Sequence, residues 1–263
     1  MQPLQELRDP GRIRGLLFDL DETLTTAGKL TAEAFAALQR LQRAGKRVVP
    51  ITGRPAGWCD HIARMWPVDA VVGENGAFYF RYCDGRLLKR YQDDTRTRAD
   101  QRARLARIGE RIVAQVPGCA LASDQPYRET DLAIDYCEDV PPLPLAAAER
   151  IAALMRAEGL SARISSIHVN GWFGDYDKLA MTQRLLAEVF ECDACALGNA
   201  KKRVFCDIRR DTRCLRQQNV KVPKKRHPAR KNHSFFHDIA RKLRRGLTKD
   251  RFDSLNNSSQ YIT

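Results

Sequence analysis

The sequence predicts an α/β fold in which a parallel sheet is interrupted by an inserted α+β segment. First, the order strand, helix, strand occurs within about 35 residues near the start of the chain, which is typical of parallel strands in a βαβ unit. Second, the pattern changes over residues 84–165 to alternating strands and helices. Third, an amphipathic helix at 177–190 returns to the first pattern. A chain of 263 residues can hold one large domain or two modest ones.

The first βαβ unit is read from apolar runs and a capping signal. Residues 14–18 form an apolar strand that ends at Asp19. Thr31 is expected to cap a helix that ends before Gly45. The apolar face of this helix comprises Phe35, Leu38 and Leu41. Residues 47–52, with the sequence RVVPIT, are expected to form the second strand.

Shorter elements follow this unit. HIARMW, at 61–66, predicts a short helix, and VDAVVG, at 68–73, predicts a third strand. Residues 76–92 are expected to form a hairpin that turns at Asp84-Gly85, because this dipeptide is favoured in two-residue turns.

The inserted segment and its exit are predicted from the same periodicities. An arginine-rich helix is expected at 98–115, a half-exposed strand at 131–136 and a helix at 145–159. Residues 162–174 are strand-like, and 177–190 form an amphipathic helix. Beyond about residue 192 these signals fade, so an irregular or disordered segment is expected there.

The charge is unevenly distributed along the chain. Residues 191–263 hold 19 Lys and Arg against 7 Asp and Glu, a net charge of +12, whereas residues 1–190 carry only +1. Such a basic segment is compatible with nucleic acid. It lacks interleaved aromatic residues and any recognised binding motif, so a nucleic-acid partner is not expected.

Apolar runs and cysteines indicate the compartment. No stretch approaches the roughly 18 apolar residues of a membrane span, and the first residues hold no apolar signal segment, so a cytoplasmic protein without a membrane partner is expected. Cys192 and Cys195 form a CxxC that could begin a zinc site with Cys206 and Cys214. The alternative is a set of incidental thiols in a reducing cytosol.

Polar side chains collect where the first two strands end. Asp19 and Asp21 follow the first strand, and Thr52, Gly53 and Arg54 follow the second. In open parallel sheets, ligands bind beyond the carboxyl ends of the strands. Either group alone could be a turn, but together they indicate a functional site.

Four stretches resemble the haloacid-dehalogenase-like (HAD) hydrolases. FDLDETLT is similar to their first motif, Asp-x-Asp-x-Thr after an apolar strand, and ITGRPAG is similar to their second. VGENGA resembles the approach to the cap of the type-two (Cof and sucrose-phosphatase-like) subgroup, and Lys178 fits the third-motif lysine. The resemblance covers about residues 13–190. It implies a Rossmann-like parallel sheet core with an inserted α+β cap domain.

The resemblance also implies the roles of the site residues. Asp19 would be the nucleophile, and Asp21 would protonate the leaving oxygen and then activate water. The Asp19 carboxylate and the Asp21 carbonyl would hold Mg²⁺. Thr52 and Gly53 would bind phosphoryl oxygens, and Lys178 would neutralise charge. The implied activity is a phosphatase acting on a small phosphorylated metabolite such as a sugar phosphate, through an aspartyl-phosphate.

The cap would choose the substrate. Arg54, Arg128, His168 and Asn170 are candidates for binding a polar, sugar-like leaving group, and structural roles are the alternative for each. The expected domains are a core at 1–83 and 166–206, a cap at 84–165 and a basic segment at 207–263.

The fourth motif of the family, Gly-Asp-x-x-x-Asp after a strand, is altered. Asp207 and Asp211 have the right spacing, so Asp207 is the candidate third metal ligand, but no glycine precedes it. One hypothesis is a frameshift after about Cys206. The alternative functions are therefore a catalytically impaired protein of the same fold and a basic nucleic-acid-binding protein.

Overall fold

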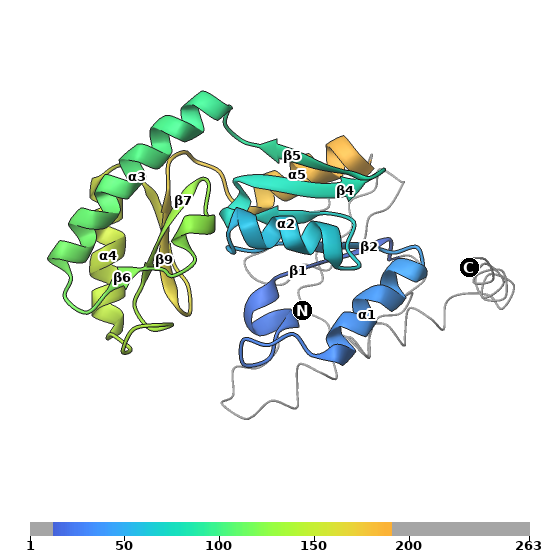
Figure 1. Cartoon of the computed structure of the whole chain (residues 1–263), viewed down its shortest axis with the longest axis horizontal. Helices are drawn as coiled ribbons and strands as arrows, with labels where there is room; N and C mark the ends of the chain where they lie inside the picture. Colours follow the sequence, from blue (N-terminus) through green and yellow to red (C-terminus); the bar gives the residue numbers. More distant parts are fainter. Residues whose placement is uncertain (1–12, 191–263) are drawn as a thin grey trace, which may run out of the picture. The chain divides into compact units, whose positions relative to one another are not determined.

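The computed structural model describes residues 13–190, coloured in Figure 1. The predictions for Cys192, Cys195, Asp207, Asp211 and the segment 207–263 therefore lie outside the described residues. The chain divides into two compact units. Of the described residues, unit 1 comprises 13–51, 65–71 and 183–190, and unit 2 comprises 52–64 and 72–182.

Unit 1 contains the predicted βαβ arrangement. β1 (Gly15–Phe18) pairs in parallel with β2 (Arg47–Pro50), and the helix α1 (Ala32–Arg43) connects them. The Thr31 hydroxyl accepts a hydrogen bond from the Ala34 amide at 3.2 Å, which confirms the predicted cap. The residues of α1 that are buried include Ala34, Ala37, Leu38 and Leu41.

The helix α2 (Ala56–Met65) begins earlier than the predicted 61–66. Its buried stripe is made largely of small residues, Ala56, Cys59 and Ala63 with Ile62, and such a stripe gives a weak hydrophobic signal. The strand β3 (Val71–Gly73) follows, and then the 3₁₀ turn η4 (Glu74–Gly76).

The predicted hairpin is confirmed in unit 2. β4 (Phe78–Cys83) and β5 (Arg86–Tyr91) are antiparallel and extend a sheet of order β3-β4-β5. Asp84 and Gly85 have φ values of +51° and +71°, the left-handed pair that a two-residue turn requires.

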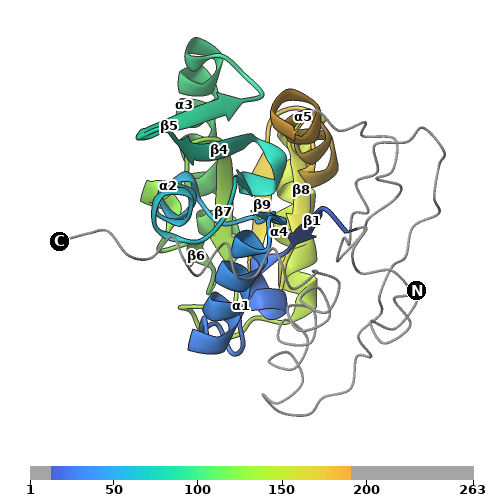
Figure 2. The same cartoon turned by 90° about the vertical axis from the view of Figure 1, so that its right-hand side faces the viewer.

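The inserted α+β segment forms a four-stranded antiparallel sheet of order β6-β7-β9-β8. Its strands are β6 (Ala120–Leu121), β7 (Asp131–Asp135), β8 (Ser161–Ile164) and β9 (His168–Trp172). The helices α3 (Thr95–Gln115) and α4 (Leu145–Ala157) pack against this sheet, with β6, β7 and β9 labelled in Figure 1 and β8 in Figure 2. Buried apolar side chains of the two helices and the sheet form one core, including Ile108, Ile112, Leu132, Ile134, Ile151 and Met155.

The strand-like stretch 162–174 is two strands rather than one. β8 and β9 are antiparallel, with Ile164 opposite Val169, and a turn at 165–167 separates them. The predicted boundary between residues 165 and 166 therefore falls inside a hairpin. A boundary that keeps the hairpin intact lies after Trp172, before α5 (Lys178–Phe190) begins. None of the helices within residues 13–190 is long and apolar enough to cross a lipid bilayer.

Candidate active site

Asp19 and Asp21 follow directly on β1 in unit 1. Asp19 accepts a hydrogen bond from the Leu20 amide at 2.9 Å and so caps the single π-helical turn η3 (Leu20–Leu24). The Thr25 amide and hydroxyl both donate to the Leu20 carbonyl, at 3.0 and 3.1 Å, and close this turn. Both aspartates are partly exposed and lie at the carboxyl end of a buried parallel strand.

Thr52 is fixed within unit 2 by its backbone and its hydroxyl. Its amide donates to the Val72 carbonyl at 2.9 Å, and its carbonyl accepts from the Asn75 amide at 3.2 Å. The fully buried hydroxyl accepts from the Arg54 amide at 3.0 Å. These bonds hold the predicted phosphate-binding residue in one orientation.

The turn η4 also meets the start of α5. A Cβ atom added to Gly76, whose φ is +106°, would lie 2.1 Å from the Asp177 carbonyl oxygen and 2.7 Å from the Lys178 nitrogen. Asp177 caps α5, because its Oδ1 accepts from two amides of the first turn at 2.9 Å each. Lys178 is the first residue of that helix. One short turn thus contacts both Thr52 and the backbone that carries Lys178.

Glu74 is a buried acid in the turn that contacts Thr52, and no role was predicted for it from the sequence. Its buried carboxylate accepts hydrogen bonds from the amides of Ala56 at 2.8 Å and Glu129 at 2.9 Å. It also accepts from the amide and hydroxyl of Thr130 and, at 3.2 Å, from the Asp131 amide. Burial, with a smaller effect of the nearby Asp131 charge, raises the pKa of Glu74 to about 7. An acid directly after an apolar strand was the available signal.

Arg128 lies in a buried polar network with only 2% of its surface exposed. Its guanidinium donates to both carboxylate oxygens of Asp124, to both of Asp131 and to the Gly53 carbonyl, at 2.9–3.1 Å. Asn170 is also buried and donates to Asp131 at 3.1 Å. Arg128 and Asn170, both predicted to bind substrate, therefore both donate hydrogen bonds to Asp131.

Arg54 and His168 meet through Glu138. The guanidinium of Arg54 lies 3.5 Å from Glu138 and 3.9 Å from Asp124, and its Cζ is 4.5 Å from the centre of the Trp58 ring. His168 Nε2 lies 2.8 Å from Glu138 Oε2, at an angle outside hydrogen-bond geometry. Burial lowers the pKa of His168, so the neutral ring is favoured there.

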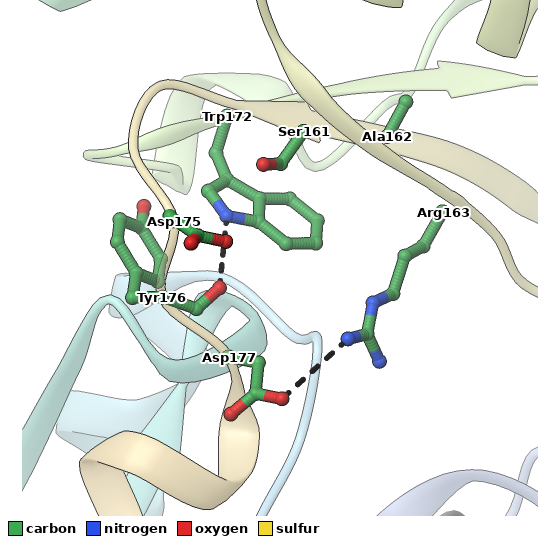
Figure 3. Close-up of a pocket in the computed structure, with 7 residues that line it drawn as sticks. All are labelled: Ser161, Ala162, Arg163, Trp172, Asp175, Tyr176 and Asp177. Atoms are coloured by element: carbon green, nitrogen blue, oxygen red, sulfur yellow. Dashed lines mark hydrogen bonds and ion pairs between the residues drawn. The ribbon is translucent and has the colours of Figure 1, made fainter.

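A pocket of about 280 Å³ lies beside the start of α5 (Figure 3). The Trp172 indole N–H donates to the Tyr176 carbonyl at 3.3 Å, and Arg163 pairs with Asp177 at 3.7 Å. The lining residues are Ser161, Ala162, Arg163, Trp172, Asp175, Tyr176 and Asp177. The pocket is polar and opens beside the segment that positions Lys178.

Asp19 and Asp21 offer oxygen donors to a Mg²⁺ ion. Within residues 13–190, no group of three or more His, Cys, Asp and Glu side chains could hold a metal ion. The Asp19 carboxylate and the Asp21 carbonyl are hard oxygen donors of the kind that Mg²⁺ prefers. These two donors fit the ion, which commonly binds through one or two carboxylates and retains waters.

Comparison with known proteins finds a similarity in the first part of the chain. Residues 16–97 match the model of the haloacid dehalogenase-like hydrolases, a match that spans about a third of the chain. No curated protein matches the sequence.

Solved structures share the fold. A Thermoplasma acidophilum protein, 0175, superposes with a TM-score of 0.52 at 16% identity, covering 66% of this chain and 71% of that one. The trehalose-6-phosphate phosphatase C-terminal domain of Candida albicans superposes with a TM-score of 0.51 at 16% identity, covering 68% and 63%. This chain thus spans less than two thirds of the Candida domain. Residues 16–97 are thus similar to the haloacid dehalogenase-like hydrolases, and the two solved structures share the fold of the described part of this chain.

Proposed function

We propose that this protein is a Mg²⁺-dependent phosphatase that hydrolyses the phosphate ester of a small metabolite in the cytoplasm. The observation that carries the proposal is the Asp19-Leu20-Asp21 sequence at the carboxyl end of β1, inside the segment that matches the hydrolase family. Thr52, whose hydroxyl accepts from the Arg54 amide, and Lys178, the first residue of α5, are the proposed phosphate-binding residues.

The aspartates divide the chemistry between them. An oxygen of Asp19 forms a bond to phosphorus, and the bond between phosphorus and the ester oxygen breaks. Asp21 gives its proton to the departing oxygen. Asp21 then takes a proton from a water molecule whose oxygen bonds to phosphorus, and this step releases phosphate and regenerates Asp19. The carboxyl group of Asp21 thus serves both half-reactions.

The remaining groups bind the phosphoryl oxygens. The Thr52 hydroxyl and the Gly53 amide are hydrogen-bond donors, and the Lys178 ammonium offsets negative charge. The Asp19 carboxylate and the Asp21 carbonyl would hold Mg²⁺, with Asp207 as the third proposed ligand outside the described residues. When bound, the ion supplies positive charge between an anionic nucleophile and an anionic substrate.

A sugar phosphate is the proposed substrate class. The Candida albicans domain of the same fold is named a trehalose-6-phosphate phosphatase. In this chain, Arg54 and Glu138 supply polar groups of the kind that bind sugar hydroxyls.

The altered fourth motif supports a second candidate, a protein of the same fold with impaired metal binding. Phosphate release measured across a Mg²⁺ titration separates the two candidates. An impaired enzyme needs millimolar rather than micromolar Mg²⁺, and Asp207→Asn then makes little further difference.

The test of the proposal is phosphate release from a panel of sugar phosphates with Mg²⁺. We expect Asp19→Asn to abolish release, because the amide is a poor nucleophile. Asp84→Asn is the matched control, since Asp84 is exposed in a hairpin turn and asparagine tolerates its left-handed backbone. Equal rates for Asp19→Asn and wild type would exclude the proposed nucleophile.

A further inference from the structure

Three segments that are distant in sequence are joined within unit 2. We call these segments, Gly53–Ala56, Glu74 and Arg128–Asp131, the clasp. At one end, Arg128 Nη1 donates to the Gly53 carbonyl at 3.0 Å. At the other end, Glu74 accepts from the Ala56 amide at 2.8 Å and the Thr130 amide at 2.6 Å. The loop after β2 is thus held at both of its ends.

The clasp fixes the peptide group between Gly53 and Arg54. Its carbonyl oxygen accepts from Arg128, and its N–H donates to the Thr52 hydroxyl oxygen at 3.0 Å. A peptide bonded at both atoms cannot rotate without losing a hydrogen bond. Within residues 13–190, no acceptor is found for the Gly53 amide or for the Thr52 hydroxyl proton. These are the two donors that phosphate would use.

Each nitrogen of the Arg128 guanidinium already donates a hydrogen bond to an acceptor within the protein. Its Nε and Nη2 donate to Asp124 at 2.9 and 3.0 Å, and its Nη1 donates to Asp131 and to Gly53. Both carboxylates are buried with it. Turning this guanidinium toward a substrate would leave buried charges without partners, which is strongly unfavourable.

The acceptors of Arg128 are themselves held in place. Asp131 Oδ2 accepts from Asn75 at 3.3 Å and from Asn170 at 3.1 Å. Asn75 belongs to η4, whose backbone also bonds to Thr52. The fork of Arg128 is therefore oriented on one side by the inserted sheet and on the other by the turn beside Thr52.

We infer that Arg128 is a positioning residue that aligns the Thr52–Gly53 donors for phosphate, rather than a ligand of the leaving group. This inference rests on the proposed phosphatase function. A positioning residue and a leaving-group ligand differ in which binding constants they affect. A positioning residue affects every ligand that contains phosphate, whereas a leaving-group ligand affects only the substrate that carries the group.

The experiment compares Arg128→Lys with wild type in the full chain. Binding of inorganic phosphate is measured by isothermal titration calorimetry with Mg²⁺. KM is measured for a sugar phosphate and for para-nitrophenyl phosphate, whose leaving group has no sugar hydroxyls. We expect the phosphate Kd and both KM values to rise by a similar factor of about ten, because lysine cannot bond Asp124, Asp131 and Gly53 together.

Two further variants make the result interpretable. Met155→Ala opens a cavity in the core of α4 and the inserted sheet, so it lowers stability without touching the clasp, and we expect its phosphate Kd to match wild type. Asp124→Asn keeps the shape of one acceptor and weakens its hold on Arg128. We expect Asp124→Asn to raise the phosphate Kd by less than Arg128→Lys does. If Arg128→Lys does not fold, Asp124→Asn tests the positioning role of Arg128 by itself.

The outcomes separate the inference from the proposed function. A wild-type protein that neither binds phosphate nor hydrolyses any ester overturns the proposed function. An active wild type with an unchanged phosphate Kd in the clasp variants overturns the positioning role. A rise confined to the KM of the sugar phosphate also overturns it and makes Arg128 a leaving-group ligand.

Discussion

Gly76→Ala tests how the turn η4 positions Lys178. The residue has φ of +106°, and its missing Cβ would lie 2.1 Å from the Asp177 carbonyl oxygen and 2.7 Å from the Lys178 nitrogen. Both neighbours are backbone atoms, so the contact cannot be relieved by turning a side chain. Alanine must therefore push η4 away from the start of α5.

The expected cost has two parts. A side chain at positive φ costs about 1–2 kcal/mol, and overpacking against fixed atoms costs about 1–3 kcal/mol. The sum is a loss of about 2–5 kcal/mol in the free energy of unfolding. For a protein of this size, that loss corresponds to a fall in Tm of about 5–15 °C. Urea unfolding followed by circular dichroism measures the free energy directly.

Gly85→Ala is the matched control for this prediction. Gly85 has a similar need for positive φ, at +71°, but nothing lies within 4 Å of its added Cβ. It should lose only about 1 kcal/mol and keep full phosphatase activity. If Gly76→Ala is as mild as Gly85→Ala and equally active, the close approach to α5 does not position Lys178.

Three more predictions concern buried groups. Glu74→Gln should lower the free energy of unfolding by about 3 kcal/mol, because an amide NH₂ would face the donors of Thr130. Urea titration measures this change, and a loss under about 1 kcal/mol would contradict the prediction. Burial lowers the pKa of His168, so the unfolded chain binds more protons than the folded protein, and the stability from the neutral ring is lost as pH falls below about 6.5. His168→Gln should therefore lose less stability than wild type between about pH 7 and pH 5, and identical pH profiles would count against the neutral ring. Burial raises the pKa of Cys59 well above its usual value, so iodoacetamide should label Cys83 and spare Cys59. Peptide mapping measures the labelling, and rapid labelling of Cys59 would contradict the prediction.

Local signals made part of the fold predictable. The Asp84-Gly85 turn and the Thr31 cap were read from single residues, because each is specified by the backbone conformation or the hydrogen bond that it needs. The βαβ unit was read from the spacing of apolar runs. Short or small-residue elements were harder, since the alanines of α2 and the two-residue strand β6 give little hydrophobic contrast.

The contacts around the candidate site were harder to predict from the sequence. Thr52, Lys178 and Arg128 could be proposed as site residues from the sequence, because it places them beside the ends of strands and helices. Their partners could not, because the bond from Arg128 to Gly53 spans 75 positions of the chain and depends on how the inserted sheet folds. Glu74 was quoted in a motif but given no role, since its bonding donors lie far along the sequence.

The central claim, that Asp19 is the nucleophile, is tested most directly by trapping its covalent intermediate. The full-length protein is mixed with a ³²P-labelled phosphate ester and Mg²⁺, quenched in acid and digested, and the labelled peptide is sequenced by mass spectrometry. We predict label on the peptide that contains Asp19, released by hydroxylamine as an acyl phosphate should be, and absent in Asp19→Asn. Label on another residue, or undiminished turnover by Asp19→Asn, would contradict the account.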